Sequence, residues 1–456
     1  MSRKIVIFII ILLSMLIALF NIPSFVLEEK IVHQHHKNQE EILSETGLKE
    51  GQLTSHLPII IIDTKGQGIP GMDRESDLKL ICDYKIINHK AKMNHSDDEK
   101  ADDEGRLALS LRGNSSLHFP KKQYSLKLLN KNNKAKNESL MGMPKHSAWV
   151  LNGSYIDDSL IRNYMLYNIS GEIFEYAPRA RFCEMMFKNE HDELDYQGVY
   201  LLLEKPRVDK NRLDLTPYDK NHKETSFMLQ INTHIDNYEI KHLLKNDALT
   251  SPLDLEYPRI DDITPMSIDY IQQEVRYFEK MLYDAEHTGD WGKVNEAIDD
   301  SFVDYFILNE FIQNYDAGIR STFIHKNLGG KYCIGPVWDF DASFNNFASI
   351  DIEIDELKMT KQSYYALLVS NPEFSDKCIR RYKELRKTYL SDEYLLNYID
   401  ETIAYLGSSI QRDVDLWHDG DMNSFLDEIE DIKEYIKNRG KWMDENFESS
   451  IQVINW

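Results

Sequence analysis

Residues 314–341 read NYDAGIRSTFIHKNLGGKYCIGPVWDFD and carry the most informative pattern in this chain of 456 residues. Two short strands, 322–326 and 331–334, flank Asn-Leu-Gly-Gly at 327–330, which is typical of a β-hairpin turn. Asp316 precedes this turn by nearly as many residues as Asp339 follows it. A hairpin therefore brings Asp316 and Asp339 to the same open end, where Asp341 could join them.

Two carboxylates at one end of a hairpin match the requirements of phosphoryl transfer. In protein kinases one aspartate accepts the proton of the attacking hydroxyl, and another, after the hairpin, binds Mg²⁺ at the nucleotide phosphates. The spacing therefore predicts Asp316 as the catalytic residue and Asp339 as a metal ligand, with Asp341 as a further candidate. Aspartates that only shape turns or cap helices are the alternative interpretation.

An upstream segment, Arg-Gly-Asn-Ser-Ser at 112–116, connects two predicted strands at 106–112 and 123–129. Its glycine permits a tight turn, and its serines offer backbone N–H and hydroxyl groups to a phosphate. A hairpin turn that binds nothing has the same composition, and this alternative stays open. The predicted cofactor-binding residues of this segment are Arg112, Gly113, Asn114, Ser115 and Ser116.

Three lysines after this segment, Lys121, Lys122 and Lys127, are candidates for the cation that pairs with nucleotide phosphates. Lys127 alternates with Leu126 and Leu128 on a strand, the position at which kinases place this lysine, so we predict a catalytic role for it. Lys122 is predicted to bind the cofactor, and an ordinary solvent-facing lysine is the alternative for both. Glu204 ends the predicted strand 198–203 and is expected near the nucleotide, unless it is a plain strand-end glutamate.

The order of elements along the chain predicts an α+β fold in two lobes. Residues 57–215 are rich in strand patterns, and residues 216–456 are mainly helical and contain the hairpin. Residues 28–56 are polar and predict a stalk. Helices are expected at 157–169, 266–286, 292–314, 372–388, 392–415 and 423–446.

The N-terminus predicts attachment to a membrane. Arg3 and Lys4 precede an apolar run, and residues 1–27 are long enough to cross a bilayer as a single-pass anchor. The basic residues would keep the N-terminus inside and place the domain on the extracytoplasmic side of the cell membrane. A cleaved signal peptide, which would make the protein secreted, is the alternative.

Composition narrows the class of partner. The net charge of −23 excludes a typical nucleic-acid binder and fits basic protein partners or simple solubility. The four cysteines are widely and irregularly spaced, which favours free thiols over a zinc site or a disulfide framework.

Several of these segments together resemble the CotH family, which is known from spore coats. The resemblance implies an atypical protein-kinase-like fold, ATP with Mg²⁺ or Mn²⁺ as cofactors, and phosphorylation of Ser/Thr in Ser-rich surface or spore-coat proteins, basic ones among them. It also implies that Asp316 is the catalytic aspartate and Asp339 the metal-binding one. The segments lie in the family's order at 112–124, 158–163, 198–204, 314–316 and 338–341.

The chain departs from the family pattern after the catalytic aspartate. The family commonly has Asn four or five residues later, where this chain has Arg320 and Ser321, so Ser321 becomes a third candidate metal ligand. Asn345 stands where a glycine is usual. An active kinase is therefore one reading, and an inactive cell-surface scaffold or adhesion protein on the same fold is another. A hydrolase with a two-metal cluster at the three aspartates is a third reading.

Overall fold

The computed structural model describes most of the chain and shows a mixed α+β fold, as predicted. The chain divides into two compact units, Met1–Lys30 and Ile31–Trp456, and every element below belongs to the second. The described residues are 29–38, 46–49, 51–71, 79–89, 92–243, 251–346 and 353–453.

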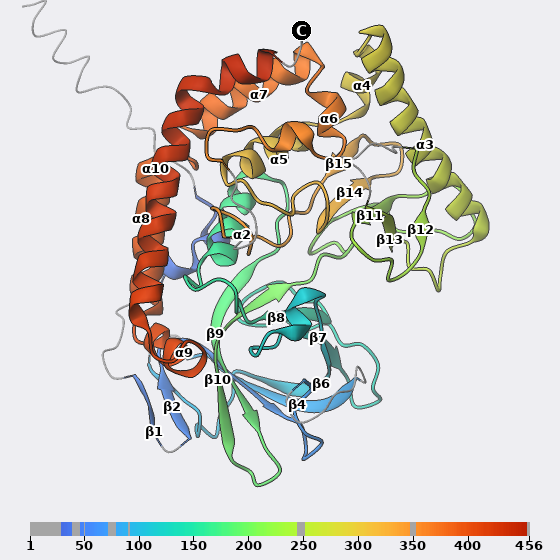
Figure 1. Cartoon of the computed structure of the whole chain (residues 1–456). Helices are drawn as coiled ribbons and strands as arrows, with labels where there is room; N and C mark the ends of the chain where they lie inside the picture. The colour runs from blue at the N-terminus through green and yellow to red at the C-terminus, as the bar shows by residue number, and fades with distance from the viewer. Residues whose placement is uncertain are drawn as a thin grey trace, which may run out of the picture. The chain divides into compact units, whose positions relative to one another are not determined.

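Seven strands close into a barrel in the order β10-β8-β7-β6-β4-β3-β9 (Figure 1). Neighbouring strands run antiparallel, except that β3 and β9 run parallel. The sequence did not predict this closure, which leaves no unpaired sheet edge. The strands are β3 (Ile59–Asp63), β4 (Leu80–Ile87), β6 (Asp103–Leu111), β7 (Tyr124–Leu129), β8 (Ala148–Asn152), β9 (Ala180–Lys188) and β10 (Leu194–Glu204).

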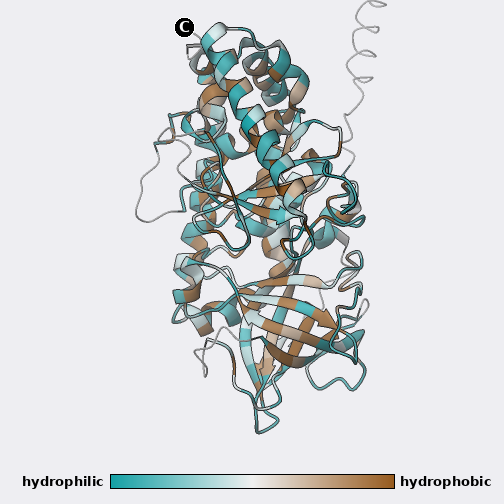
Figure 2. Cartoon of the chain, turned by 90° about the vertical axis from the view of Figure 1, so that its right-hand side faces the viewer, coloured by the Kyte–Doolittle hydropathy of each residue, from teal (hydrophilic) through white to brown (hydrophobic). Residues whose placement is uncertain are grey.

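Strands β9 and β10 are buried on both faces. Cys183 and Tyr200 point into the barrel core, whereas Phe182 and Leu201 belong to the larger core shared with the helices. Figure 2 shows the resulting concentration of hydrophobic residues along the barrel strands. Burial on both faces explains why residues 199–203 form a continuous apolar run instead of alternating.

A second sheet has the order β12-β13-β11-β14-β15 and contains the predicted hairpin. Ile324 of β14 lies opposite Ile334 of β15, in antiparallel register. Strand β14 also pairs with β11, a long-range partner that no local pattern indicated. The strands are β11 (Phe227–Ile231), β12 (Glu239–Ile240), β13 (Leu253–Tyr257), β14 (Thr322–Lys326) and β15 (Tyr332–Ile334); a small separate sheet joins β1 (Gly47–Lys49), β2 (Gln52–Ser55) and β5 (Asn94–His95).

The helices follow the predicted pattern with shifted ends. The helix expected at 157–169 starts at Arg162, because Asp157 accepts hydrogen bonds from both the backbone N–H and the guanidinium of Arg162. The helix expected at 392–415 breaks at Gly407, which has a positive φ of 52°. The helices are α2 (Arg162–Ile173), α3 (Pro265–Thr288), α4 (Gly292–Ala297), α5 (Ser301–Phe311), α6 (Tyr365–Leu368), α7 (Pro372–Leu385), α8 (Asp392–Leu406), α9 (Ser409–Trp417) and α10 (Met422–Val453).

Part of the predicted polar stalk is packed into the protein. His33 and His36 are buried, and the backbone N–H of His36 donates to the Tyr164 hydroxyl at 3.1 Å. The Tyr398 hydroxyl on α8 donates to the carbonyl of His33 at 3.2 Å. Burial lowers the pKa of His36 to about 3, so this histidine enters the core as a neutral ring. Residues that count as polar in a sequence reading therefore behave here as aromatic packing groups.

The predicted attachment to a membrane is contradicted. Within the described ranges, no helix is both long enough and apolar enough to cross a bilayer. The prediction of a single-pass protein at the cell membrane falls with it. The segment on which both predictions rested, residues 1–27, lies outside the described residues.

A buried ion pair joins the barrel to the C-terminal helices. The Lys121 ammonium lies 2.6 Å from Oδ1 of Asp413 on α9, and the two side chains are 1% and 0% exposed. The same carboxylate oxygen accepts a hydrogen bond from the backbone N–H of Val199 on β10. Gly198 is required beside it, because a Cβ there would come within 2.3 Å of that oxygen.

We expect Lys121→Met to lower the free energy of unfolding by about 3–5 kcal/mol, because it leaves the Asp413 carboxylate buried without its counter-charge. Urea denaturation measures the change. Lys127→Met is the matched control, since Lys127 is exposed, and it should change stability by less than about 0.5 kcal/mol. Equal effects of the two substitutions would show that the pair does not stabilise the fold.

Candidate active site

The open end of the β14–β15 hairpin brings the segments of Asp316 and Asp339 together. The Asn314 side chain donates a hydrogen bond to the backbone carbonyl of Asp339 at 3.1 Å. The Ser321 hydroxyl donates to Oδ2 of Asp339 at 3.2 Å. These contacts place Asp316, Ser321 and Asp339, all selected from the sequence, in one cluster, and their chemical roles remain predictions.

Asp316 lies in an environment that suits a base. Burial and the charge of Asp339 raise the pKa of Asp316 to about 6, while Arg320 and Lys358 act in the opposite direction. Nε of Arg320 lies 3.0 Å from Oδ1 of Asp316. A carboxylate whose pKa lies close to neutrality holds a proton more readily than an exposed aspartate and is still ionised at pH 7.

Helix α2 fixes the Trp338–Asp341 segment through its backbone. Asn163 accepts a hydrogen bond from the backbone N–H of Phe340 at 3.0 Å, and its amide also donates to Asp341. One turn later, the Tyr167 hydroxyl accepts from the backbone N–H of Asp339 at 3.1 Å. Asp339 adopts a positive φ of 66°, an uncommon conformation for a non-glycine residue that these contacts stabilise.

Asp339 and Asp341 concentrate negative charge next to Asp316. Burial, together with the charges of Asp339 and Asp157, raises the pKa of Asp341 well above its ordinary value. Arg162 and Arg112 offset only part of this effect. The Asp341 carboxyl therefore holds its proton more readily than an exposed aspartate, and a divalent cation at this cluster would favour its ionised form.

The Arg-Gly-Asn-Ser-Ser segment reaches the aspartates through its arginine. The Arg112 guanidinium lies 5.3 Å from the centre of the Trp338 ring, and the charges of Asp339 and Asp341 act on it. Gly113 has a φ of 109°, and a Cβ there would come within 1.7 Å of the Ser116 hydroxyl oxygen, so no larger residue fits. Residues Ser115–His118 form a short 3₁₀ turn, and Asn114 donates to the Thr233 hydroxyl at 3.3 Å.

Other residues selected from the sequence are not joined to this cluster by any contact among the described residues. Lys127 is exposed on the outside of the barrel, opposite Ala148 of β8. The Lys122 ammonium donates to the carbonyl of Leu117 at 2.8 Å and so stabilises its own loop. Glu204 is fully buried, and both of its carboxylate oxygens lie 3.0 Å from Nη1 of Arg179, so its charge is already neutralised.

Four residues of the site were not assigned a role from the sequence. Asn163 and Tyr167 are four residues apart on one helix, and this spacing was the available signal for a shared face. Lys205 directly follows Glu204, and burial with the charges of Arg207 and Arg112 lowers its pKa to about 7. Lys358 comes from a segment beyond the hairpin, and no sequence pattern connected it to Asp316.

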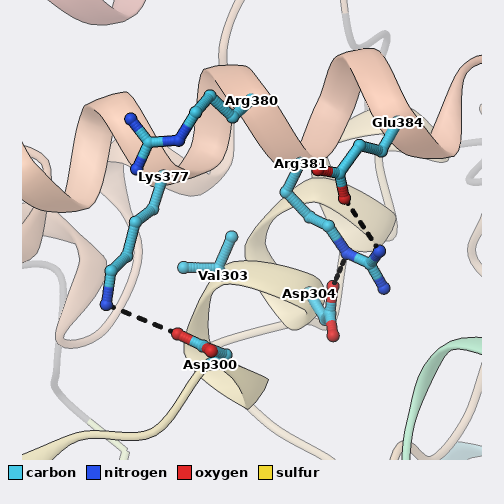
Figure 3. Close-up of a pocket in the computed structure, with 7 residues that line it drawn as sticks. All are labelled: Asp300, Val303, Asp304, Lys377, Arg380, Arg381 and Glu384. Atoms are coloured by element: carbon cyan, nitrogen blue, oxygen red, sulfur yellow. Dashed lines mark hydrogen bonds and ion pairs between the residues drawn. The ribbon is translucent and has the colours of Figure 1, made fainter.

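A pocket of about 360 Å³ lies elsewhere, between α5 and α7 (Figure 3). Its charges largely neutralise one another: Arg381 lies 2.7 Å from Asp304, and Lys377 lies 3.4 Å from Asp300. The aspartates belong to the start of α5, whereas Asp316 follows the end of that helix. This pocket is therefore separate from the aspartate cluster.

A family described as CotH kinase protein matches residues 109–443, which include the 112–116 segment and all the aspartates of the cluster. Among curated proteins, none matches the chain.

The raised pKa of Asp316 predicts a pH-dependent effect of Asp316→Asn on stability. Between the ordinary value of 3.8 and about 6, the folded protein holds a proton that the unfolded chain has released, so stability falls as the pH rises through this window. Asparagine carries no such charge. We therefore expect the variant to gain about 1 kcal/mol relative to the unsubstituted protein between pH 5 and pH 8.

Chemical denaturation at the two pH values measures this difference. The interaction with Arg320 is one of the influences that set this pKa, so the expected difference already includes it. Asp261→Asn, at an exposed position (78%), is the control and should show no comparable change. A pH-independent effect of Asp316→Asn would contradict the assigned environment of Asp316.

Proposed function

Because this chain belongs to the CotH family of kinase proteins, we propose that it is an atypical protein kinase that transfers the γ-phosphoryl group of ATP to serine or threonine. The observation that carries the proposal is the half-buried Asp316 beside Asp339 at the end of one hairpin. Ser-rich proteins of the spore-coat kind are the proposed acceptors, with basic ones favoured by the net charge of −23. A two-lobed kinase-like arrangement of residues 57–215 and 216–456 is part of the same proposal.

The cations around the cluster support an anionic ligand. Arg112 lies close enough to Lys205 for its positive charge to help lower the pKa of Lys205. Arg207, the third cation, is already paired with Glu256 at 2.6 Å. The Lys205 ammonium forms no hydrogen bond or ion pair within the described parts of the chain, so Arg112 and Lys205 are the groups we propose to contact the phosphates of ATP.

The donor set fits a magnesium ion that is shared with a nucleotide. Among the described residues, no cluster of three or more His, Cys, Asp and Glu side chains could hold a metal alone. Mg²⁺ is commonly bound by one or two carboxylates together with substrate phosphates. Asp339 and Asp341, with the Ser321 hydroxyl, would hold Mg²⁺ or Mn²⁺, and the ion would offset the charge of the phosphates.

Asp316 would act as the general base. It accepts the proton of the acceptor hydroxyl while that oxygen bonds to the γ-phosphorus. The bond from this phosphorus to the bridging oxygen breaks, and its electron pair leaves with ADP. Arg320 orients the Asp316 carboxylate through their ion pair at 3.0 Å, and Asn163 and Tyr167 hold the neighbouring aspartates in place.

The proposal predicts metal-dependent transfer of labelled phosphate from ATP to the protein itself or to a Ser-rich basic peptide. Asp316→Asn should reduce the rate by about 10²–10⁴-fold, the usual contribution of a general base, and keep binding of ADP with Mg²⁺. Asp339→Ala should lose transfer as well as the metal-dependent part of nucleotide binding, measured as thermal stabilisation.

The combination of outcomes separates the alternatives. Transfer that survives Asp339→Ala would remove Asp339 from the metal site. If neither metal nor nucleotide stabilises the purified full chain, the kinase proposal is wrong and an inactive scaffold on this fold takes its place.

The pH dependence of catalysis has a predicted direction. Asp316 must be ionised to accept a proton, so kcat/KM, which reports ionisation in the free enzyme, should rise with pH on the acidic side, through about 6. The residual rate of Asp316→Asn should lack this acidic limb. An unchanged limb in the variant would assign it to another group.

A further inference from the structure

A rigid network of hydrogen bonds and one ion pair positions Lys358 near Asp316. The backbone N–H groups of Lys358 and Met359 donate to the two carboxylate oxygens of Glu310 on α5, at 2.9 and 2.6 Å. Glu310 is held in turn by Arg439 of α10 at 2.7 Å, and both of these side chains are fully buried. A buried ion pair and two backbone hydrogen bonds therefore fix the position of Lys358.

The Lys358 side chain lies near Asp316, the proposed base, rather than near Arg112 and Lys205, the cations proposed to bind the nucleotide. Its ammonium donates to the backbone carbonyl of Asn314 and lies 5.0 Å from the centre of the Tyr315 ring. Its charge is close enough to Asp316 to influence the ionisation of that carboxyl. An ammonium has three donors, and only the one to Asn314 is used among the described residues.

The environment of this ammonium favours an anion. Burial is the main influence and lowers the pKa of Lys358 to about 7; Glu310 and Asp316 act to raise it, and Arg320 acts to lower it further. Arg320, the other cation at the base, is committed to Asp316 and stacks over Tyr315 at 5.5 Å. Lys358 is thus a cation at Asp316 that is not itself paired with this carboxylate and that keeps free donors.

We propose that Lys358 is a catalytic residue that donates a hydrogen bond to the transferring phosphoryl group on the side of the acceptor hydroxyl. This inference rests on the proposed kinase function. As the acceptor oxygen bonds to phosphorus and the bond to ADP breaks, negative charge is spread over the equatorial oxygens, next to the carboxylate of Asp316. Lys358 keeps its own proton and offsets this charge, while the hydroxyl proton goes to Asp316.

The test uses ADP and Mg²⁺ with and without aluminium fluoride, which forms a planar mimic of the transferring phosphoryl group. Titration calorimetry of the full chain measures how much fluoride tightens the binding of ADP. Lys358→Gln keeps a donor for the Asn314 carbonyl and removes the charge. It should leave ADP binding unchanged and reduce the fluoride-dependent gain in ADP affinity by about 10²-fold. It should also lower kcat by a similar factor without raising KM for ATP.

Two further variants control the experiment. Lys361→Gln changes an exposed lysine three residues away, paired with Glu356 at 3.1 Å, and should behave like the unsubstituted protein. Lys358→Arg retains the charge and should keep part of the fluoride tightening, which a purely structural role for Lys358 would not predict. A melting curve for each variant shows that it is folded, and the Arg variant carries the test if the Gln variant is not.

The outcomes distinguish this inference from the proposal on which it rests. If the unsubstituted protein binds ADP with Mg²⁺ and Lys358→Gln retains the full tightening by fluoride, the role of Lys358 is refuted while the kinase function stands. The same holds if Lys358→Arg loses the tightening completely in a folded protein. If the unsubstituted protein binds no nucleotide, both proposals fail together.

Discussion

Electrostatic repulsion among half-buried carboxylates is the constraint on which the rest of this site depends. Burial and the charge of Asp339 raise the pKa of Asp316 to about 6, and the same two causes act on Asp341. Negative charge held away from water is unfavourable until a cation shares it. Arg112 approaches from the barrel and Arg320 from the hairpin, yet the surplus remains. A site with this imbalance is suited to bind a metal ion together with the phosphates that the metal accompanies.

The protein keeps these carboxylates together by fixing the backbone around them. Asn163 and Tyr167 bind backbone N–H groups of the Asp339 segment, and Glu310 does the same for Lys358. The supporting residues come from helices that pack into one continuous core with the outer faces of β9 and β10. The geometry of the cluster is therefore coupled to the packing of the barrel against the helices, which the Lys121–Asp413 pair reinforces.

Local regularities in the sequence identified a large part of this arrangement. The hairpin and the approach of Asp316 to Asp339 followed from strand spacing and a Gly-containing turn. Lys127, for which a catalytic role was predicted, is exposed on β7 and has no contact with the cluster among the described residues. Closure of the barrel, the pairing of β14 with β11, and the separation of α4 from α5 at Ile298, which bridges to Tyr332, depend on contacts between distant segments. The stalk interpretation did not indicate that His36 packs in the core as a neutral ring, because polarity was taken as a sign of exposure.

Sequence alone was sufficient for the α+β class, the hairpin, the family, and the identity of the central aspartates. These features follow from short-range periodicity and from chemistry that needs particular residue types at a fixed spacing. The surroundings of the lysines became visible only in three dimensions: Lys121 is buried against Asp413, Lys127 is exposed, and Lys358 approaches Asp316 from a remote segment. The energy of a charge depends on how much water surrounds it and which charges lie nearby, and folding sets both of these.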